Sequence, residues 1–405
     1  MNACDTFPGP VVAVVGGGQL ARMMAPAAGE LGVRLRALVE APDSSTAQVV
    51  VDSHQGIASD EAAIRSLIST DAAVLTFEHE HVPNALLQDL IDHGTPVRPG
   101  PDALVFAQDK IAMRTRLTEL GIPCPRWAAL PTEPQAARAA IAEFLAASPS
   151  GRQAVLKTSR GGYDGKGVRI ISSPDDAADW IDAAADGAPP LLVEEKVPFS
   201  RELAALVARR ASGEVRAWPV VESVQRGGVC SEVIAPAPGL SSNTERAIEQ
   251  LAMTIATELD VTGVLAVEMF EVAGESGVPQ VLVNELAMRP HNSGHWTIDG
   301  AVTSQFEQHL RAVLDWPLGA TDARATWTVM ANVLGSSLEC LTDALPRLMA
   351  QYPEAKVNLY GKGIRVGRKL AHVNVSGDDL DQVRERALAA AALLRGDVAP
   401  EEVNR

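Results

Sequence analysis

The sequence is short of cysteine and of positive charge, and each shortage excludes a class of protein. Its four cysteines stand far apart among 405 residues, with neither a C-x-x-C zinc pattern nor the spacing of a disulfide framework. This usage is typical of a reducing cytoplasm. The 35 lysines and arginines face 51 acidic residues, a net charge of −16. Because nucleic-acid-binding surfaces are basic, we expect no nucleic-acid partner.

Long apolar runs are missing too. No run approaches the roughly 20 residues that a membrane helix needs, so we expect no membrane span. The N-terminus lacks a basic stretch followed by an apolar core, so we expect no signal peptide. With 46% hydrophobic and 21% charged residues, the composition is that of a soluble globular protein, and the length favours two to four domains.

The most informative segment is a glycine-rich loop from Lys157 to Val168, with the sequence KTSRGGYDGKGV. Apolar runs on both sides predict a strand, a loop and a second strand. Glycines let the backbone approach phosphate oxygens closely, and the cations Arg160 and Lys166 add positive charge. The segment therefore predicts a nucleotide phosphate loop. The alternative is a glycine-rich hairpin with a solvated basic tip.

The N-terminal part has the alternation of strands and helices that is typical of a parallel α/β sheet. We expect strands over 11–15, 35–39 and 72–77, and helices over 20–31 and 61–68. Pro26 predicts a kink or a restart in the first helix. The turn Gly16–Gln19 and the nearby acid Glu40 suggest a dinucleotide site, but the third glycine of that fingerprint is absent.

Further elements follow along the chain. We expect helices over 109–120, 131–147, 241–259 and 387–395, strands over 191–193, 264–270 and 281–286, a hairpin of 203–208 with 215–221, and a small unit from about 323 with strands near 326–333 and 363–366. Asp109 is a suitable N-cap for the first of these helices, and Gly121 a suitable stop.

Two carboxylates interrupt apolar strands at matching places. If 264–270 and 281–286 pair antiparallel about the turn at 274–277, Glu268 and Glu285 fall nearly opposite each other. Neighbouring carboxylates in an apolar setting repel and raise each other's pKa. Mg²⁺ removes that cost, and Asn284 offers a neutral oxygen beside them. The pattern predicts a magnesium site, and the alternative is a solvated acidic face.

Two further polar segments suggest substrate binding. Residues 289–296 read RPHNSGHW and directly follow the second acidic strand. Residues 360–369 read YGKGIRVGRK, and four cations in eight residues suit a phosphomonoester. A surface loop and a solvated basic turn are the respective alternatives.

Taken together, these motifs closely resemble the N5-carboxyaminoimidazole ribonucleotide synthase family, ATP-grasp enzymes of purine biosynthesis. The segments that carry the resemblance lie between residues 10 and 375 and read GGGQLARM, EHEHVP, GGYDGKG, NELAMRPHNSGHWT and GIRVGRKLAHVN. The last two together are the most specific. The chain departs from the family at Gln225, where a histidine is often found, and at Met288, where a proline is usual.

The resemblance implies an ATP-grasp fold of mixed α/β and α+β class. Its expected parts are a Rossmann-like parallel-sheet substrate domain (1–107), a flexible ATP-grasp lid (108–198), a central antiparallel-sheet domain with the metal site (199–322) and a small β-rich C-terminal domain (323–405). It implies ATP, one or two Mg²⁺ ions and bicarbonate as cofactors or co-substrates, 5-aminoimidazole ribonucleotide as substrate, a homodimer and a cytoplasmic location.

The resemblance also implies roles for particular residues. ATP would be bound by Lys110, Lys157, the closing loop Gly162, Tyr163, Asp164, Gly165, Lys166, Gly167 and Val168, the adenine-edge segment Glu194, Glu195, Lys196 and Val197, the ribose ligand Glu202, and Gln225. Mg²⁺ would be held by Glu268, Glu285 and Asn284, of which the last two would also belong to the ATP site. The catalytic residues would be Arg289, Tyr163, His291 and Asn292. The ribonucleotide would meet Glu78, Glu80, Asp164, Lys166, Arg365, Arg368 and Lys369.

The implied reaction is a bicarbonate-dependent carboxylation of the exocyclic amine of the ribonucleotide, through carboxyphosphate. Other ATP-grasp ligases, such as a formate-dependent glycinamide ribonucleotide transformylase or a biotin carboxylase, are alternatives, but GIRVGRKLAHVN and HNSGH argue against both. A nucleotide sensor on the same fold would bind ATP without bicarbonate-dependent turnover. A dinucleotide-dependent oxidoreductase would use the Gly16 turn and would be stabilised by NAD(P)H.

Overall fold

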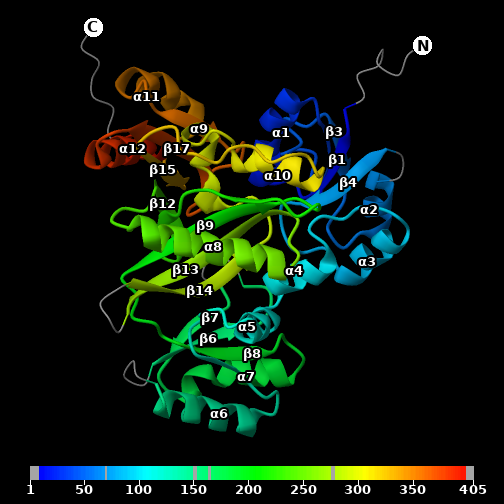
Figure 1. Ribbon diagram of the computed structural model, residues 1–405, viewed down its shortest axis with the longest axis vertical. Helices are drawn as coiled ribbons and strands as arrows, with labels where there is room; N and C mark the ends of the chain where they lie inside the picture. The colour runs from blue at the N-terminus through cyan, green and yellow to red at the C-terminus, as the bar shows by residue number, and fades with distance from the viewer. Residues whose placement is uncertain (1–8, 69–70, 149–152, 163–165, 275–278, 398–405) are drawn as a thin grey trace.

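The computed structural model describes residues 9–68, 71–148, 153–162, 166–274 and 279–397 (Figure 1). The strands in these ranges form three sheets. No helix within these ranges is both long enough and apolar enough to cross a membrane.

The first sheet is parallel, as predicted, with strand order β3-β2-β1-β4. Its strands are β1 (Val11–Val15), β2 (Arg34–Val39), β3 (Asp52–Gln55) and β4 (Ala72–Phe77), and its helices are α1 (Gln19–Leu31), α2 (Glu61–Ile68), α3 (Asn84–Asp92) and α4 (Pro101–Gln108). Every residue of β1 is buried, because a central strand of a parallel sheet is covered on both faces. The helix α1 continues through Pro26, so the restart that was the alternative to a kink does not occur there.

The region predicted to be the lid, called the lid below, contains a four-stranded antiparallel sheet of order β5-β8-β6-β7, at the lower end of Figure 1. Its elements are α5 (Lys110–Glu119), β5 (Trp127–Ala129), α6 (Pro134–Ala146), β6 (Ala154–Thr158), β7 (Val168–Ile171), α7 (Ala178–Ala185) and β8 (Leu191–Glu195). Asp109 caps α5 as expected, because its carboxylate accepts the amides of Ile111 and Ala112. The buried side chains of Ile141 and Ile181 pack on this sheet and form a separate small core.

The third sheet is the largest and runs β14-β13-β9-β11-β12-β15-β17-β16, with β10 paired to β9. Its strands are β9 (Arg201–Arg209), β10 (Val215–Ala217), β11 (Val221–Arg226), β12 (Val229–Ala235), β13 (Gly263–Ala273), β14 (Pro279–Ala287), β15 (Trp327–Leu334), β16 (Lys356–Leu359) and β17 (Lys369–Gly377). The helices that accompany it are α8 (Ser242–Glu258), α9 (Thr297–Gly300), α10 (Gln305–Val313), α11 (Leu345–Gln351) and α12 (Leu380–Arg395). The C-terminal strands therefore continue the central sheet through the pairing of β12 with β15.

Two predicted strands differ from the structure, one entirely and one in part. Residues 363–366 form an irregular segment, because Gly361 and Gly367 both adopt positive φ angles and the chain turns between them. The expected strand over 215–221 is divided at Pro219, which has no N–H to donate to a ladder, so that β10 and β11 are separate strands.

A buried histidine joins the first sheet to the central one. The Nδ1 atom of His309, on α10, accepts the Val264 amide of β13 at 3.1 Å. Its Nε2 atom therefore carries the proton and donates to the Thr76 hydroxyl of β4, with the two atoms 2.9 Å apart. This bridge fixes the edge of the parallel sheet beside the strands that carry the candidate site.

Candidate functional site

Glu268 and Glu285 face each other on β13 and β14, as the sequence predicted. The register then skips a residue, because Met269 faces Val283, and Asn284 is left as the extra residue of a β-bulge. A regular strand would send Asn284 and Glu285 to opposite faces, whereas the bulge allows both to face the lid. The side chains of Glu268 and Glu285 are 27% and 41% exposed, so both carboxylates border an accessible space.

Two lysines of the lid region meet this strand. Lys110, at the start of α5, places its ammonium 2.6 Å from Oε1 of Glu285. Lys157, on β6, donates to Oδ1 of Asn284 at 3.1 Å. The two residues that were predicted to contact ATP phosphates therefore lie directly beside the predicted magnesium ligands.

Lys157 also belongs to a buried group of three charges. Glu194, on β8, contacts the Lys157 ammonium and Nε of Arg114, each at 2.7 Å. Burial acts to raise the pKa of Glu194, but the two cations outweigh it and lower that pKa to about 2. Arg114 also donates to the carbonyl oxygens of Val283 and Asn284, at 2.9 and 2.8 Å. This arginine thus fastens α5 to the bulged strand.

The glycine-rich loop has the predicted strand on each side, with β6 and β7 paired antiparallel. Two of its glycines are needed for close contacts. A Cβ atom at Gly162 would lie 2.7 Å from the Lys166 carbonyl oxygen, and one at Gly167 would lie 2.5 Å from the Thr158 hydroxyl. Tyr163, Asp164 and Gly165 lie outside the described residues.

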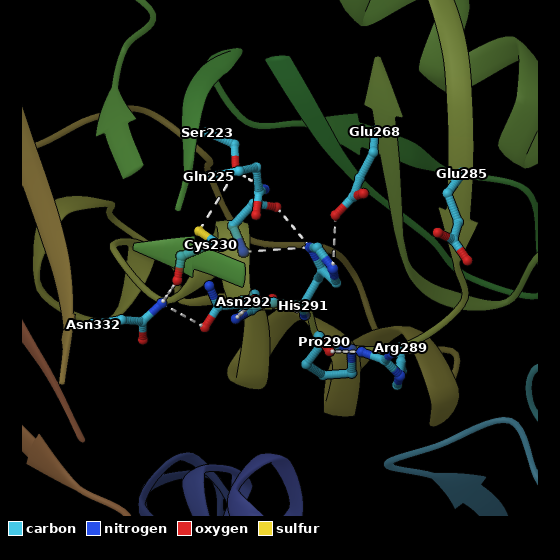
Figure 2. A network of polar contacts seen from close by, with 12 residues as sticks. Ser223, Gln225, Cys230, Glu268, Glu285, Arg289, Pro290, His291, Asn292 and Asn332 are labelled. Atoms are coloured by element: carbon cyan, nitrogen blue, oxygen red, sulfur yellow. Dashed lines mark hydrogen bonds and ion pairs between the residues drawn. The ribbon is translucent and has the colours of Figure 1, made fainter. Parts of the chain in front are cut away.

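His291 contacts one carboxylate of the pair, that of Glu268 (Figure 2). Its Nδ1 atom accepts the Ser293 amide at 3.3 Å, so Nε2 carries the proton and donates to Oε1 of Glu268 at 3.2 Å. Burial, together with the charges of Arg289 and Lys369, lowers the pKa of His291 to about 3. Burial and the nearby carboxylate of Glu285 raise the pKa of Glu268 to about 7. A neutral histidine therefore faces a carboxylate whose charge is costly.

The polar segment after β14 is held from several directions. Gln305, on α10, accepts the His291 amide at 2.7 Å and donates to the His291 carbonyl at 2.8 Å. Arg289 forms an ion pair with Glu80 at 3.1 Å, which links the segment to the first domain. Asn292 is buried, and Gln225 donates to the Ser223 hydroxyl at 3.1 Å. Figure 2 shows both near His291.

Glu78 occupies a different position from the other predicted substrate ligands. It is buried, and its carboxylate accepts the backbone amides of Gly18 and Ala21 at the N-terminus of α1. Burial raises the pKa of Glu78, while these amides act to lower it. The Glu78 carboxylate is thus bound to the start of α1, whereas Glu80 contacts Arg289 in the polar segment after β14.

The remaining nucleotide candidates lie at the end of β8, directly after it, or on β9. The Glu195 amide donates to the Arg126 carbonyl at 2.8 Å, and Lys196 donates to Oε1 of Gln153 at 2.6 Å. Val197 is half-buried just beyond the strand. Glu202 is half-buried on β9, where burial raises its pKa.

The basic C-terminal segment lies against the first domain. The Lys362 ammonium contacts Oε1 of Gln19, and the Gly361 carbonyl accepts from Gln48 at 2.7 Å. Arg365 is exposed, and Arg368 donates to the Gly363 carbonyl at 3.1 Å. Lys369, at the start of β17, lies close enough to His291 for its charge to act on that ring. The segment therefore spans from the glycine turn at α1 to the central site.

Sequence reasoning missed three residues that hold this site together. These are Arg114, Gln305 and Asn332. The helices and strands that carry them were predicted from the spacing of apolar residues. Such a prediction places every polar side chain on the solvent-exposed face. Arg114 gave one usable signal, since it lies directly beside Met113, which the helix buries.

The donor set fits magnesium better than a metal held by protein alone. In the described ranges no three His, Cys, Asp or Glu side chains are grouped to hold a metal ion. Glu268, Glu285 and Asn284 offer oxygen atoms only, and magnesium usually combines one or two carboxylates with phosphate oxygens and water. The raised pKa of Glu268 fits such a ligand, because a divalent cation would relieve the repulsion between the two carboxylates.

Comparison with known proteins agrees with this geometry. Three family models match in succession: a ribonucleotide synthetase preATP-grasp domain over residues 10–108, an ATP-grasp domain over 115–306, and a phosphoribosylaminoimidazole carboxylase C-terminal domain over 328–386. The fold and site therefore define an ATP-grasp ligase.

The relatives define the family more closely. N5-carboxyaminoimidazole ribonucleotide synthase of Corynebacterium ammoniagenes is 51% identical over 95% of this chain and 92% of its own length. The crystal structure of the synthetase from Thermus thermophilus is 36% identical, with a TM-score of 0.82 over 96% of this chain and 100% of that one. The Aspergillus clavatus enzyme in complex with ADP and 5-aminoimidazole ribonucleotide is 29% identical, with a TM-score of 0.83 over 96% and 99%. The chain belongs to the N5-carboxyaminoimidazole ribonucleotide synthase family.

Proposed function

We propose that this enzyme carboxylates the exocyclic amine of 5-aminoimidazole ribonucleotide, consuming ATP and bicarbonate and releasing ADP and phosphate. The observation that carries the proposal is the meeting of Glu268, Glu285 and Asn284 with Lys110 and Lys157. Carboxylates for a metal and cations for phosphates converge there from the central sheet and the lid.

The chemistry proceeds in two steps. A bicarbonate oxygen attacks the γ-phosphorus of ATP, the bond to the bridging oxygen breaks, and ADP leaves with its electron pair. The resulting carboxyphosphate, or the CO₂ that it releases, then receives the ribonucleotide amine at carbon. Phosphate departs, and the amine nitrogen loses a proton. No step needs a covalent nucleophile from the protein.

The protein's part is to bind, orient and neutralise charge. Glu268, Glu285 and Asn284 would hold one or two Mg²⁺ ions, which supply positive charge during phosphoryl transfer. Lys110 and Lys157, which contact Glu285 and Asn284, would meet the phosphate oxygens. The loop of residues 162–168 would close over the nucleotide and exclude water from the carboxyphosphate.

The ribonucleotide would lie between the first domain and the C-terminal segment. Arg289, the neutral His291 and Asn292 would border the ribonucleotide from the central sheet, and Glu80, which forms an ion pair with Arg289, would border it from the N-terminal part. Arg365, Arg368 and Lys369 would bind the ribonucleotide phosphate, because guanidinium and ammonium groups suit a phosphomonoester.

The test is ADP release from Mg²⁺-ATP with and without bicarbonate and with and without 5-aminoimidazole ribonucleotide. We expect strong stimulation only when both co-substrates are present, and loss of release when EDTA removes the metal. ATP hydrolysis that is indifferent to the ribonucleotide would contradict the proposed substrate. Stimulation without bicarbonate would contradict the carboxyphosphate route.

The proposal includes a cytoplasmic homodimer, as the resemblance implies. The widely spaced cysteines support a reducing compartment, since they offer no disulfide framework. Light scattering after size-exclusion chromatography should give twice the chain mass of 42.7 kDa. A mass of one chain at assay concentrations would reject the dimer.

A further inference from the structure

A side chain from the C-terminal strands reaches the candidate active-site segment through the protein core. Asn332, on β15, is 3% exposed, and its Nδ2 atom donates to Oδ1 of Asn292 at 3.2 Å and to the Cys230 carbonyl oxygen at 2.9 Å. Figure 2 shows Asn332 on one side of Asn292, with His291, which contacts Glu268, on the other. Both acceptors are buried, so water does not replace these bonds readily.

The Asn332 side chain extends the contact between β12 and β15 beyond their backbone pairing. Backbone pairing of β12 with β15 runs from Ala235 opposite Thr328 to Glu232 opposite Ala331. Asn332 is the next residue of β15. There a side-chain hydrogen bond, from Asn332 to the Cys230 carbonyl, connects the two strands. These two acceptors fix the orientation of the Asn332 carboxamide. A flipped amide would place its Oδ1 atom against the Cys230 carbonyl oxygen and Oδ1 of Asn292.

We propose that Asn332 is a positioning residue for the carboxylation reaction, an inference that rests on the proposed function. Its amide fixes Oδ1 of Asn292 and thereby the short stretch His291–Ser293, which includes the ring that donates to Glu268. Loss of this anchor allows the stretch to shift relative to the carboxylate pair. A displacement of about an ångström costs catalysis far more than it costs substrate binding.

Asn374 is a matched control. It lies two residues after His372, which pairs with Asn332 across β15 and β17. Asn374, on β17, is 1% exposed and also makes two bonds through Nδ2, to the His295 carbonyl at 3.1 Å and to Asp299 at 2.8 Å. In the described part of the chain, Oδ1 of neither asparagine has a partner. Truncation of either removes the same atoms and two hydrogen bonds, of which only the one to Asp299 is part-buried, and of the two asparagines only Asn332 donates to Asn292.

The experiment compares Asn332→Ala, Asn332→Ser and Asn374→Ala with the wild type. Thermal unfolding gives the loss of stability, and all kinetics are measured at a temperature where each variant is folded. We expect N332A to lower kcat by about tenfold or more, with the KM for ATP nearly unchanged, as for residues that orient others. N374A should keep kcat within about threefold, and N332S, which retains a donor, should recover part of the loss.

Equal kcat losses in N332A and N374A would overturn the positioning role and leave a purely structural one. So would a loss in N332A that appears only in the two KM values. Failure of the proposed function is recognised separately, because the wild type would then show no ADP release that depends on the ribonucleotide.

Discussion

The charge group behind the nucleotide lysine allows a quantitative prediction. Glu194→Gln keeps the size of the side chain but removes the negative charge that Arg114 and Lys157 share. The three side chains are 3%, 0% and 10% exposed, so solvent screens little of the interaction. The variant leaves two buried cations without their counter-ion, which is the costly way to break a buried ion pair.

The expected magnitude follows from the pKa of Glu194. Its fall from the ordinary 4.5 to about 2 corresponds to about 3 kcal/mol of stabilisation of the folded lid at neutral pH. Because the folded-state pKa lies below the unfolded one, this contribution is complete above the ordinary value of 4.5 and is lost as the pH falls toward 2. The difference between wild type and variant should therefore be about 1 kcal/mol smaller near pH 4 than near pH 7.

The assay is urea unfolding followed by circular dichroism at both pH values, with the free energy taken by linear extrapolation. Asp175→Asn is the control, because it breaks an ion pair of the same lid, Arg138 with Asp175 at 3.0 Å, whose carboxylate is 92% exposed. That variant should lose less than about 1 kcal/mol. A deficit in E194Q no larger than in D175N, or one that does not shrink in acid, would refute the reasoning.

Three further predictions concern ligands. Glu285→Gln should lower ribonucleotide-dependent ADP release by about a hundredfold or more by weakening Mg²⁺ binding, and near-normal release in steady-state assays would reject the metal role. Arg368→Ala should raise the KM of the ribonucleotide about tenfold and leave that of ATP unchanged, whereas equal effects would move Arg368 out of the phosphate site. Gly361→Ala would place a Cβ atom 2.2 Å from Oε1 of Gln48 and should raise the ribonucleotide KM several-fold. Gly94→Ala shares the positive φ angle but has nothing within 4 Å, so it should leave both KM values unchanged.

Much of the fold could be predicted because local patterns agreed with the tertiary structure. The apolar run of β1, the N-cap at Asp109 and the opposition of Glu268 to Glu285 all depend on residues close in sequence or on a single hairpin. The strand predicted over 363–366 was wrong because apolar residues among glycines resemble a strand. The positive φ angles that bend the chain there cannot be predicted from hydropathy.

The site could be predicted as a set of residues but not as an arrangement. The sequence pointed to Asn284 beside Glu285, yet in a regular strand the two would face opposite ways, and only the bulge opposite Glu268 allows both to meet the lid. Arg114 and Asn332 stayed unseen because each is a polar group satisfied by distant backbone carbonyls. No local pattern records such a partner.

The glycine turn before α1 shows how a familiar motif can serve another purpose. A Cβ atom at Gly16 would lie 2.2 Å from Cγ of Glu78, and one at Gly18 would lie 2.5 Å from its Oε1. The carboxylate comes from the end of β4 and accepts the amides at the start of α1, the place where a dinucleotide-binding fold receives a diphosphate. The amides at the N-terminus of α1 are therefore already bound by the Glu78 carboxylate. The glycines are required by the approach of Glu78, and a diphosphate could take that position only by displacing this buried carboxylate.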